Sequence, residues 1–122
     1  MIGYVTLGTN DFEKSRAFYD ALLAELGGKR AFASDRMQGY SNGNGPMVAI
    51  CKPYDGKPAQ PGNGTMVSLA APDRPTVDKV YAKAISLGAA DEGAPGERMP
   101  TFYGAYFRDP DGNKFCVFKS GK

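Results

Sequence analysis

The stretch Tyr4–Gly8, YVTLG, recurs as MVSLA at Met66–Ala70, an offset of 62 residues between positions 4 and 66. Both stretches carry the alternating side-chain pattern that predicts a β-strand. At the same offset Asp11 falls on Asp73, and each aspartate can act as the N-cap of a following helix. A repeated order of strand, cap and helix predicts that the chain contains the same structural unit twice.

Each half of the chain has the pattern of a strand and a helix followed by three strands. In the first half we expect a strand at 2–8, a helix from Asn10 or Asp11 to about Leu26, and strands at 30–33, 36–41 and 46–52. In the second half we expect a strand at 65–71, a helix from about Pro75 to Gly88, a short strand at 89–92, a Gly-Pro loop at 93–100, and strands at 103–109 and 114–119. The pattern predicts an α+β fold of two βαβββ modules, at 1–52 and 64–122, within a single domain, 1–122.

The composition is that of an ordinary globular protein, and it excludes several function classes. The chain has 122 residues and a net charge of +2, which is too balanced to argue for a nucleic acid or an anionic membrane as partner. It contains no histidine, which excludes a Ser-His-Asp or Cys-His catalytic site and a zinc site of the usual imidazole kind. Proton transfer near neutral pH would fall to a carboxylate, lysine, tyrosine or cysteine.

The two cysteines indicate a reducing compartment. Cys51 and Cys116 are too few for a disulfide framework and are not spaced as a metal clip. No apolar run approaches the ~18 residues that span a bilayer, and the first residues lack the basic and apolar blocks of a signal peptide. We therefore expect a cytoplasmic protein with both thiols reduced.

Four stretches carry a family resemblance over nearly the whole chain. They are VTLG at Val5–Gly8, DFEKSRAFY at Asp11–Tyr19, GNGT at Gly62–Thr65 and YGAYFRDPDGNKF at Tyr103–Phe115. With the two modules, they resemble the vicinal oxygen chelate superfamily, which includes glyoxalase I, the fosfomycin and bleomycin resistance proteins and the extradiol dioxygenases. The resemblance implies that each module contributes a curved sheet, that the concave faces enclose a cavity, and that the protein forms a homodimer.

The resemblance also locates the family's metal ligands, which come from the first and last strands of each module. The matching first-strand positions are Tyr4 and Met66, and the last-strand position of the second module is Cys116. The fourth ligand falls on Ala49 or Ile50. None of these side chains suits a hard divalent ion, which needs carboxylate or imidazole donors. We therefore expect no metal cofactor, although the family commonly uses one.

Strand alternation gives a candidate lining for the cavity. In fosfomycin-resistance relatives, the positions that match Thr6 and Tyr106 help to bind the phosphonate of the substrate. The candidate residues also have plain structural interpretations. Tyr106 can be an aromatic residue of the core, and Arg108 can be a solvated charge at the edge of the sheet. The predicted ligand-binding set is Tyr4, Thr6, Met66, Ser68, Tyr106, Arg108, Cys116 and Phe118.

Two function classes follow from these residues. The first is a binding module, similar to the antibiotic-resistance proteins, that holds a small organic molecule without a metal. The second is a divergent enzyme of the lactoylglutathione lyase type, in which Tyr4, Tyr106 or Cys116 performs acid–base or nucleophilic chemistry. A third class, a pure interaction partner, would leave the cavity empty.

Overall fold

The computed structural model describes residues 1–121, and the chain divides into two compact units, Met1–Pro61 and a second that begins at Gly62. The elements of the first unit are β1 (Tyr4–Gly8), α1 (Phe12–Ala24), β2 (Lys29–Ala33), β3 (Met37–Ser41) and β4 (Met47–Cys51). Its sheet has the order β1-β4-β3-β2, with β1 parallel to β4 and the other pairs antiparallel.

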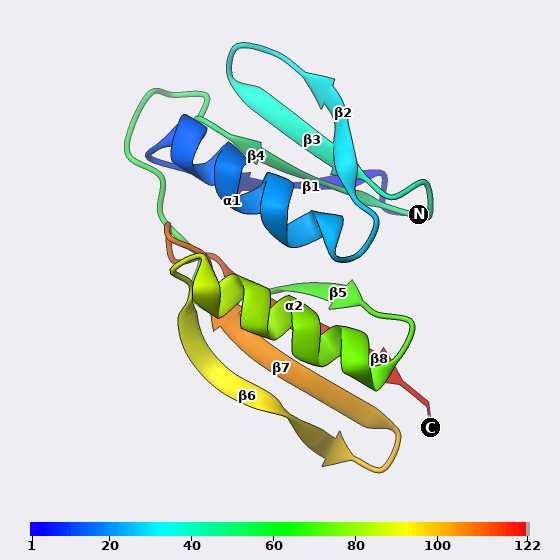
Figure 1. Ribbon diagram of the computed structural model, residues 1–122. Coiled ribbons are helices and arrows are strands. Elements are labelled where there is room, and N and C mark those ends of the chain that lie inside the picture. The colour runs from blue at the N-terminus through cyan, green and yellow to red at the C-terminus, as the bar shows by residue number, and fades with distance from the viewer. Residues whose placement is uncertain (122) are drawn as a thin grey trace. The chain divides into compact units, whose positions relative to one another are not determined.

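The second unit repeats this topology. Its elements are β5 (Val67–Ala70), α2 (Arg74–Ser86), β6 (Ala90–Met99), β7 (Phe102–Arg108) and β8 (Lys114–Ser120), and its sheet has the order β5-β8-β7-β6. Strand β5 is parallel to β8, and the other pairs are antiparallel. In each unit the helix lies along one side of its own sheet (Figure 1). The expected α+β fold of two βαβββ modules is confirmed.

Both helices begin at the aspartates that the repeat places in register. Asp11 is the N-cap of α1, and its Oδ1 accepts a hydrogen bond from the Lys14 amide at 3.1 Å. Asp73 is the N-cap of α2, and its Oδ1 accepts from the Thr76 amide at 2.8 Å. Each cap satisfies one of the amide groups that the first turn of a helix leaves unpaired.

The prediction for the segment before β7 was wrong. We expected a strand at 89–92 and a loop at 93–100, but β6 continues to Met99 and pairs with β7 as far as Phe102. The pairing register shifts at three places: between Asp91 and Gly93, between Gly93 and Gly96, and between Glu97 and Met99. Because β6 is an edge strand, it tolerates these irregularities and the missing amide of Pro95. Glycine and proline therefore mark bulges here.

The core of each unit lies between its helix and one face of its sheet. In the first unit the fully or nearly fully buried side chains are Leu7, Phe18, Tyr19, Leu22, Leu23, Tyr40 and Ile50. In the second they are Leu69, Val77, Val80, Ala84, Ala105, Phe107, Phe115 and Val117. Because side chains alternate between the two faces of a strand, the core residues of each sheet lie on the face toward the helix. The opposite face of each sheet is not covered by that helix.

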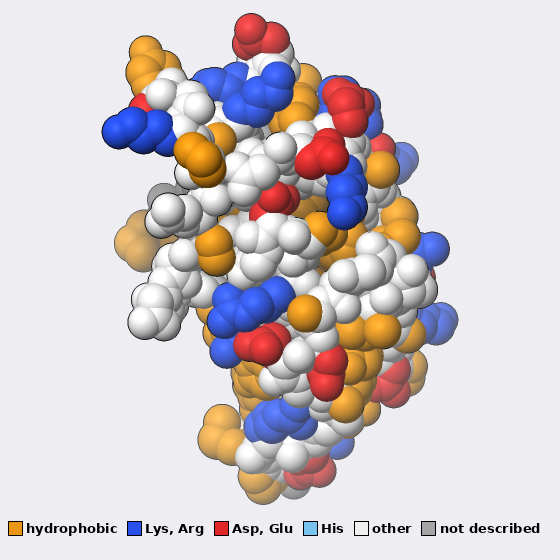
Figure 2. Space-filling view, turned by 90° about the vertical axis from the view of Figure 1, so that its left-hand side faces the viewer, with side chains coloured by type: hydrophobic (Ala, Val, Ile, Leu, Met, Phe, Trp, Pro, Cys, Tyr) orange, Lys and Arg blue, Asp and Glu red, His pale blue; other side chains and the backbone are white. Residues whose placement is uncertain are grey.

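Charged side chains of both signs are intermixed with apolar ones on the face drawn in Figure 2. Neither helix is long and apolar enough to cross a lipid bilayer, as judged over residues 1–121. A cavity enclosed by the concave faces of the two sheets stays a prediction.

Candidate functional site

The sheet of the second unit presents a face on the side opposite α2. The pairing of its strands places Ser68 opposite Cys116, and Cys116 opposite Tyr106. Tyr106 in turn pairs with Gly93, so four strands contribute one residue each to a single row. We call the surface around this row the open face; it consists of Ser68, Gly93, Arg98, Phe102, Gly104, Tyr106, Arg108, Lys114, Cys116 and Phe118.

The Cys116 thiol lies at the centre of the row. The side chain is 1% exposed, and the strand pairing places Ser68 on one side of it and Tyr106 on the other. Burial raises the pKa of Cys116, and this outweighs the opposite effect of the two hydroxyls and of the cations Arg98 and Lys114. Cys116 is therefore a neutral thiol near pH 7, held by two polar neighbours.

Two aromatic rings lie beside this thiol. Phe102 and Phe118 stack with ring centroids 5.3 Å apart and an interplanar angle of 9°. Their approach depends on Gly104, because a Cβ at that position would lie 3.0 Å from Cε2 of Phe102 and 3.7 Å from Sγ of Cys116. Because Gly104 has no side chain, the two stacked rings lie directly beside the row of polar residues. Apolar rings next to a few polar groups are a typical composition for a small-molecule site.

Two cations lie around the ring of Tyr106, which follows Cys116 in the row. The Arg98 guanidinium carbon is 5.5 Å from the ring centroid, and the Lys114 ammonium nitrogen is 5.8 Å from it. Burial is the main cause that raises the pKa of Tyr106. By contrast, Arg108 is engaged, since its Nε donates to Glu92 at 3.1 Å and its Nη1 donates to the Gly112 carbonyl at 2.9 Å.

The remaining predicted site residues lie in other surroundings. Met66 directly precedes β5 and is 43% exposed. Tyr4 and Thr6 lie on β1 in the first unit, on the side of the sheet away from α1; the Tyr4 ring contacts Phe32 edge-on at 5.3 Å. The structure thus brings Ser68, Tyr106 and Cys116 into contact and places Arg108 and Phe118 on the same face.

The register also decides between the two candidates for the fourth family ligand position. Thr6 pairs with Ala49 in the first sheet as Ser68 pairs with Cys116 in the second. Ala49 is therefore the counterpart of Cys116, and Ile50 belongs to the core beneath α1.

Arg98 is not among the predicted site residues, because its segment was expected to be a loop. The available signal was the spacing of Gly93, Gly96 and Arg98, which is compatible with an edge strand that bulges to admit a long side chain.

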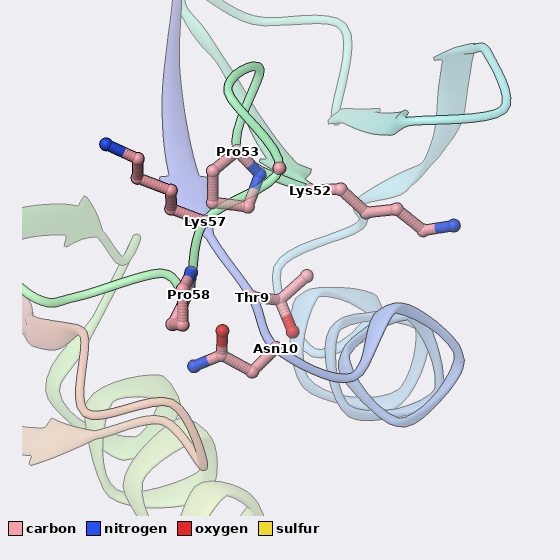
Figure 3. A pocket seen from close by; sticks show the side chains of 7 residues that line it. Thr9, Asn10, Lys52, Pro53, Lys57 and Pro58 are labelled. Carbon is pink, nitrogen blue, oxygen red and sulfur yellow. The ribbon is translucent and has the colours of Figure 1, made fainter.

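The first unit carries a separate pocket of about 380 Å³, lined by Thr9, Asn10, Lys52, Pro53, Gly56, Lys57 and Pro58. The ammonium groups of Lys52 and Lys57 point away from one another (Figure 3). They do not converge on one point, so the pocket has no evident anion site.

The family comparison agrees with this architecture. The sequence model of the glyoxalase/bleomycin resistance protein/dioxygenase superfamily matches residues 1–117. The chain belongs to that superfamily. It is 38% identical to a glyoxalase/bleomycin resistance protein from Albidiferax ferrireducens T118, with 98% of each chain covered and a TM-score of 0.90.

Two more distant structures share the fold. A glyoxalase/bleomycin resistance protein/dioxygenase family enzyme from Burkholderia phytofirmans PsJN is 22% identical, with 97% of each chain covered and a TM-score of 0.78. A lactoylglutathione lyase from Agrobacterium tumefaciens is 20% identical, with 98% of this chain and 92% of that chain covered and a TM-score of 0.71. No curated protein matches the sequence significantly.

The residues at the family's metal-ligand positions do not fit a hard divalent ion. Ala49 offers no donor atom, Met66 offers a thioether, and Cys116 is a buried thiol whose pKa is raised. Such an ion needs several charged oxygen or imidazole donors. Residues 1–121 contain no cluster of three or more His, Cys, Asp or Glu side chains that could hold one elsewhere.

Proposed function

We propose that this member of the glyoxalase/bleomycin resistance superfamily binds a small organic molecule on its open face without a metal ion. The observation that carries the proposal is the row of Ser68, Cys116 and Tyr106, in which the place of a family metal ligand is taken by a thiol. A buried, neutral thiol between two hydroxyl-bearing residues supplies no negative charge to a cation.

The neighbouring side chains support an aromatic or otherwise flat ligand. Phe102 and Phe118 present stacked rings, and the Phe102 ring lies close over Gly104, where no side chain separates it from the sheet. Aromatic surfaces with a few polar groups bind flat organic molecules through ring contact and area burial.

Isothermal titration calorimetry tests both parts of the proposal. Ni²⁺, Zn²⁺, Mn²⁺ and Co²⁺ should each give no stoichiometric site of sub-micromolar affinity, whereas 2-naphthol, a flat and neutral probe at pH 7, should bind with one site. The variant Phe118→Ala should weaken 2-naphthol binding at least about fivefold, because it removes half of the aromatic stack. Phe12→Ala, which removes a half-exposed ring of the first unit, should leave the affinity within about twofold. A sub-micromolar metal site, or a Phe118→Ala variant that binds like the wild type, would contradict the proposal.

An enzyme of the lactoylglutathione lyase type is the alternative. The observation in its favour is that Tyr106 and Cys116 lie opposite one another in the paired strands β7 and β8, so that a proton could pass between their side chains. Turnover of the methylglyoxal–glutathione hemithioacetal that is lost in Cys116→Ser would favour this alternative.

Homodimer formation, inferred from the family, and a cytoplasmic location remain part of the proposal. Light scattering after size-exclusion chromatography measures the oligomeric state.

A further inference from the structure

Arg98 and Lys114 form an unneutralised pair of cations on the open face. Both lie around the Tyr106 ring, at 5.5 and 5.8 Å from its centroid. Over residues 1–121, neither has a carboxylate within 4.0 Å, while the neighbouring Arg108 is paired with Glu92. Two like charges around one ring repel each other, and an anion placed between them would remove that repulsion.

The Arg98 guanidinium lies beside two glycines of β6, in the part of that strand where the pairing with β7 is irregular. A Cβ at Gly96 would lie 2.8 Å from Nη1 of Arg98, and a Cβ at Gly93 would lie 3.2 Å from Nη2. The same Cβ of Gly93 would lie 3.2 Å from Cδ2 of Tyr106, and this glycine has a φ of 153°. Two glycines thus form the space in which the guanidinium reaches over the ring.

A single backbone contact holds the guanidinium in this place. Its Nη2 donates to the carbonyl of Ala94 at 2.7 Å. A guanidinium has five N–H donors in a fixed fork, and in residues 1–121 Arg98 uses no others in a hydrogen bond or ion pair. It can therefore bind a planar carboxylate through two parallel hydrogen bonds while it remains stacked on Tyr106.

The order of groups along the open face defines the rest of the ligand. The aromatic stack of Phe102 and Phe118 lies on one side of Cys116, and the cations lie around Tyr106 on the other. We infer that the open face selects aromatic carboxylates, with Arg98 as the residue that recognises the carboxylate and Lys114 as a second positive charge. This inference rests on the proposed function, because it assigns a ligand class to the same face.

Calorimetry with 2-naphthoate and 2-naphthol separates the inference from the proposed function. The two probes share the ring system and differ in charge, so the ratio of their affinities reports recognition of the anion. We expect 2-naphthoate to bind at least about tenfold more tightly in 50 mM NaCl, and we expect this ratio to fall as NaCl is raised, since salt screens exposed charges.

Substitutions then identify the residue. Arg98→Gln should reduce the ratio at least about threefold, Arg98→Lys should reduce it less, and Lys114→Gln should lower it about threefold. Arg74→Gln is the matched control: Arg74 also lies over a tyrosine, with its guanidinium carbon 5.0 Å from the Tyr103 centroid, but it is paired with Glu97. Its removal should leave the ratio unchanged. A variant that fails to fold would bind neither probe, so a variant that still binds 2-naphthol but has lost the preference for 2-naphthoate is folded.

Two results would overturn the inference. Equal affinities of the two probes in the wild type would refute anion selection and leave the proposed function standing. A ratio that is the same in Arg98→Gln as in the wild type would refute the role of Arg98. If neither probe binds, the proposed function fails together with the inference.

Discussion

The Phe32 ring occupies the space beside Gly39 that a side chain would need. A Cβ at Gly39 would lie 2.4 Å from Cε1 of Phe32, which is far inside van der Waals contact. Phe32 in turn contacts Tyr4 edge-on. The face of the first sheet that α1 does not cover is therefore closed over Gly39 by an aromatic ring, whereas the corresponding face of the second sheet keeps a thiol and two hydroxyls.

The variant Gly39→Ala should lower the free energy of unfolding by about 1–3 kcal/mol, because the added methyl displaces the Phe32 ring. Gly3→Ala is the control, since a Cβ there meets no atom within 4 Å. Urea unfolding measures both. An unchanged midpoint for Gly39→Ala would show that the ring is not fixed in this position.

Tyr40→Phe should destabilise the first unit more than Tyr103→Phe destabilises the second. The Tyr40 side chain is 2% exposed, and its hydroxyl donates to Asp20 Oδ1 at 2.9 Å and lies 3.2 Å from the Arg16 carbonyl. Loss of this buried hydroxyl should cost about 2 kcal/mol of unfolding free energy. The Tyr103 hydroxyl contacts Asp78 at the surface, so its loss should cost about 0.5 kcal/mol. Equal losses would contradict the account.

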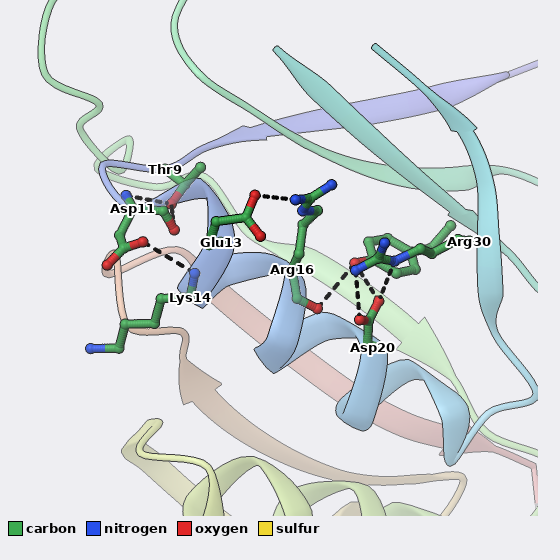
Figure 4. A network of polar contacts seen from close by, with 8 residues as sticks. Thr9, Asp11, Glu13, Lys14, Arg16, Asp20 and Arg30 are labelled. Carbon is green, nitrogen blue, oxygen red and sulfur yellow. Dashed lines mark hydrogen bonds and ion pairs between the residues drawn. The ribbon is translucent and has the colours of Figure 1, made fainter. Parts of the chain in front are cut away.

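The pH dependence of stability should include a contribution from Asp20. Hydrogen bonds from Arg30, at 2.8 and 2.9 Å, are the largest cause that lowers the pKa of Asp20 below its ordinary value of 3.8; the contact is drawn in Figure 4. A lowered pKa means that the charged form is favoured by folding. The resulting stabilisation is present above the ordinary pKa and is lost as pH falls through the lowered one.

Asp20→Asn should therefore be less stable than the wild type at pH 7 and should lose less stability between about pH 5 and about pH 2. Arg30→Gln should flatten the acid limb in the same way, because it removes the partner. Chemical unfolding at a series of pH values measures this, and parallel acid limbs in all three proteins would refute the assignment.

The two cysteines should differ in their reaction with a thiol reagent. Cys51 is partly exposed, whereas Cys116 is buried and its pKa is raised by that burial. With 5,5′-dithiobis(2-nitrobenzoic acid) at pH 7, one thiol should react quickly and the second at least about tenfold more slowly. Cys51→Ser should remove the fast phase. A fast phase that persists in Cys51→Ser would show that Cys116 is a reactive thiolate.

The sequence predicted the duplicated modules because strand alternation and helix caps are local signals, and both aspartate caps lie where the repeat places them. It also predicted which residues of β7 and β8 share a face, since side chains alternate strictly along a regular strand. The site could be predicted to that extent: Ser68, Tyr106 and Cys116 lie together because they occupy one row.

Arg98 could not be predicted in the same way. Its position depends on register shifts in β6 and on space left by two glycines, and neither follows from a period-two pattern. The closure of Gly39 by Phe32 is likewise a contact between two strands. Such contacts depend on pairing register, which a single sequence does not specify.

The central claim is that a small organic molecule binds the open face of the second unit without a metal, and nuclear magnetic resonance tests it most directly. Uniformly ¹⁵N-labelled protein in buffer with EDTA is titrated with 2-naphthol, and the amide resonances are followed. The account predicts that the largest shifts fall on Gly104, Tyr106 and Cys116. Shifts that appear only after a divalent metal is added, or that gather around Lys52 and Lys57 in the first unit, would contradict it.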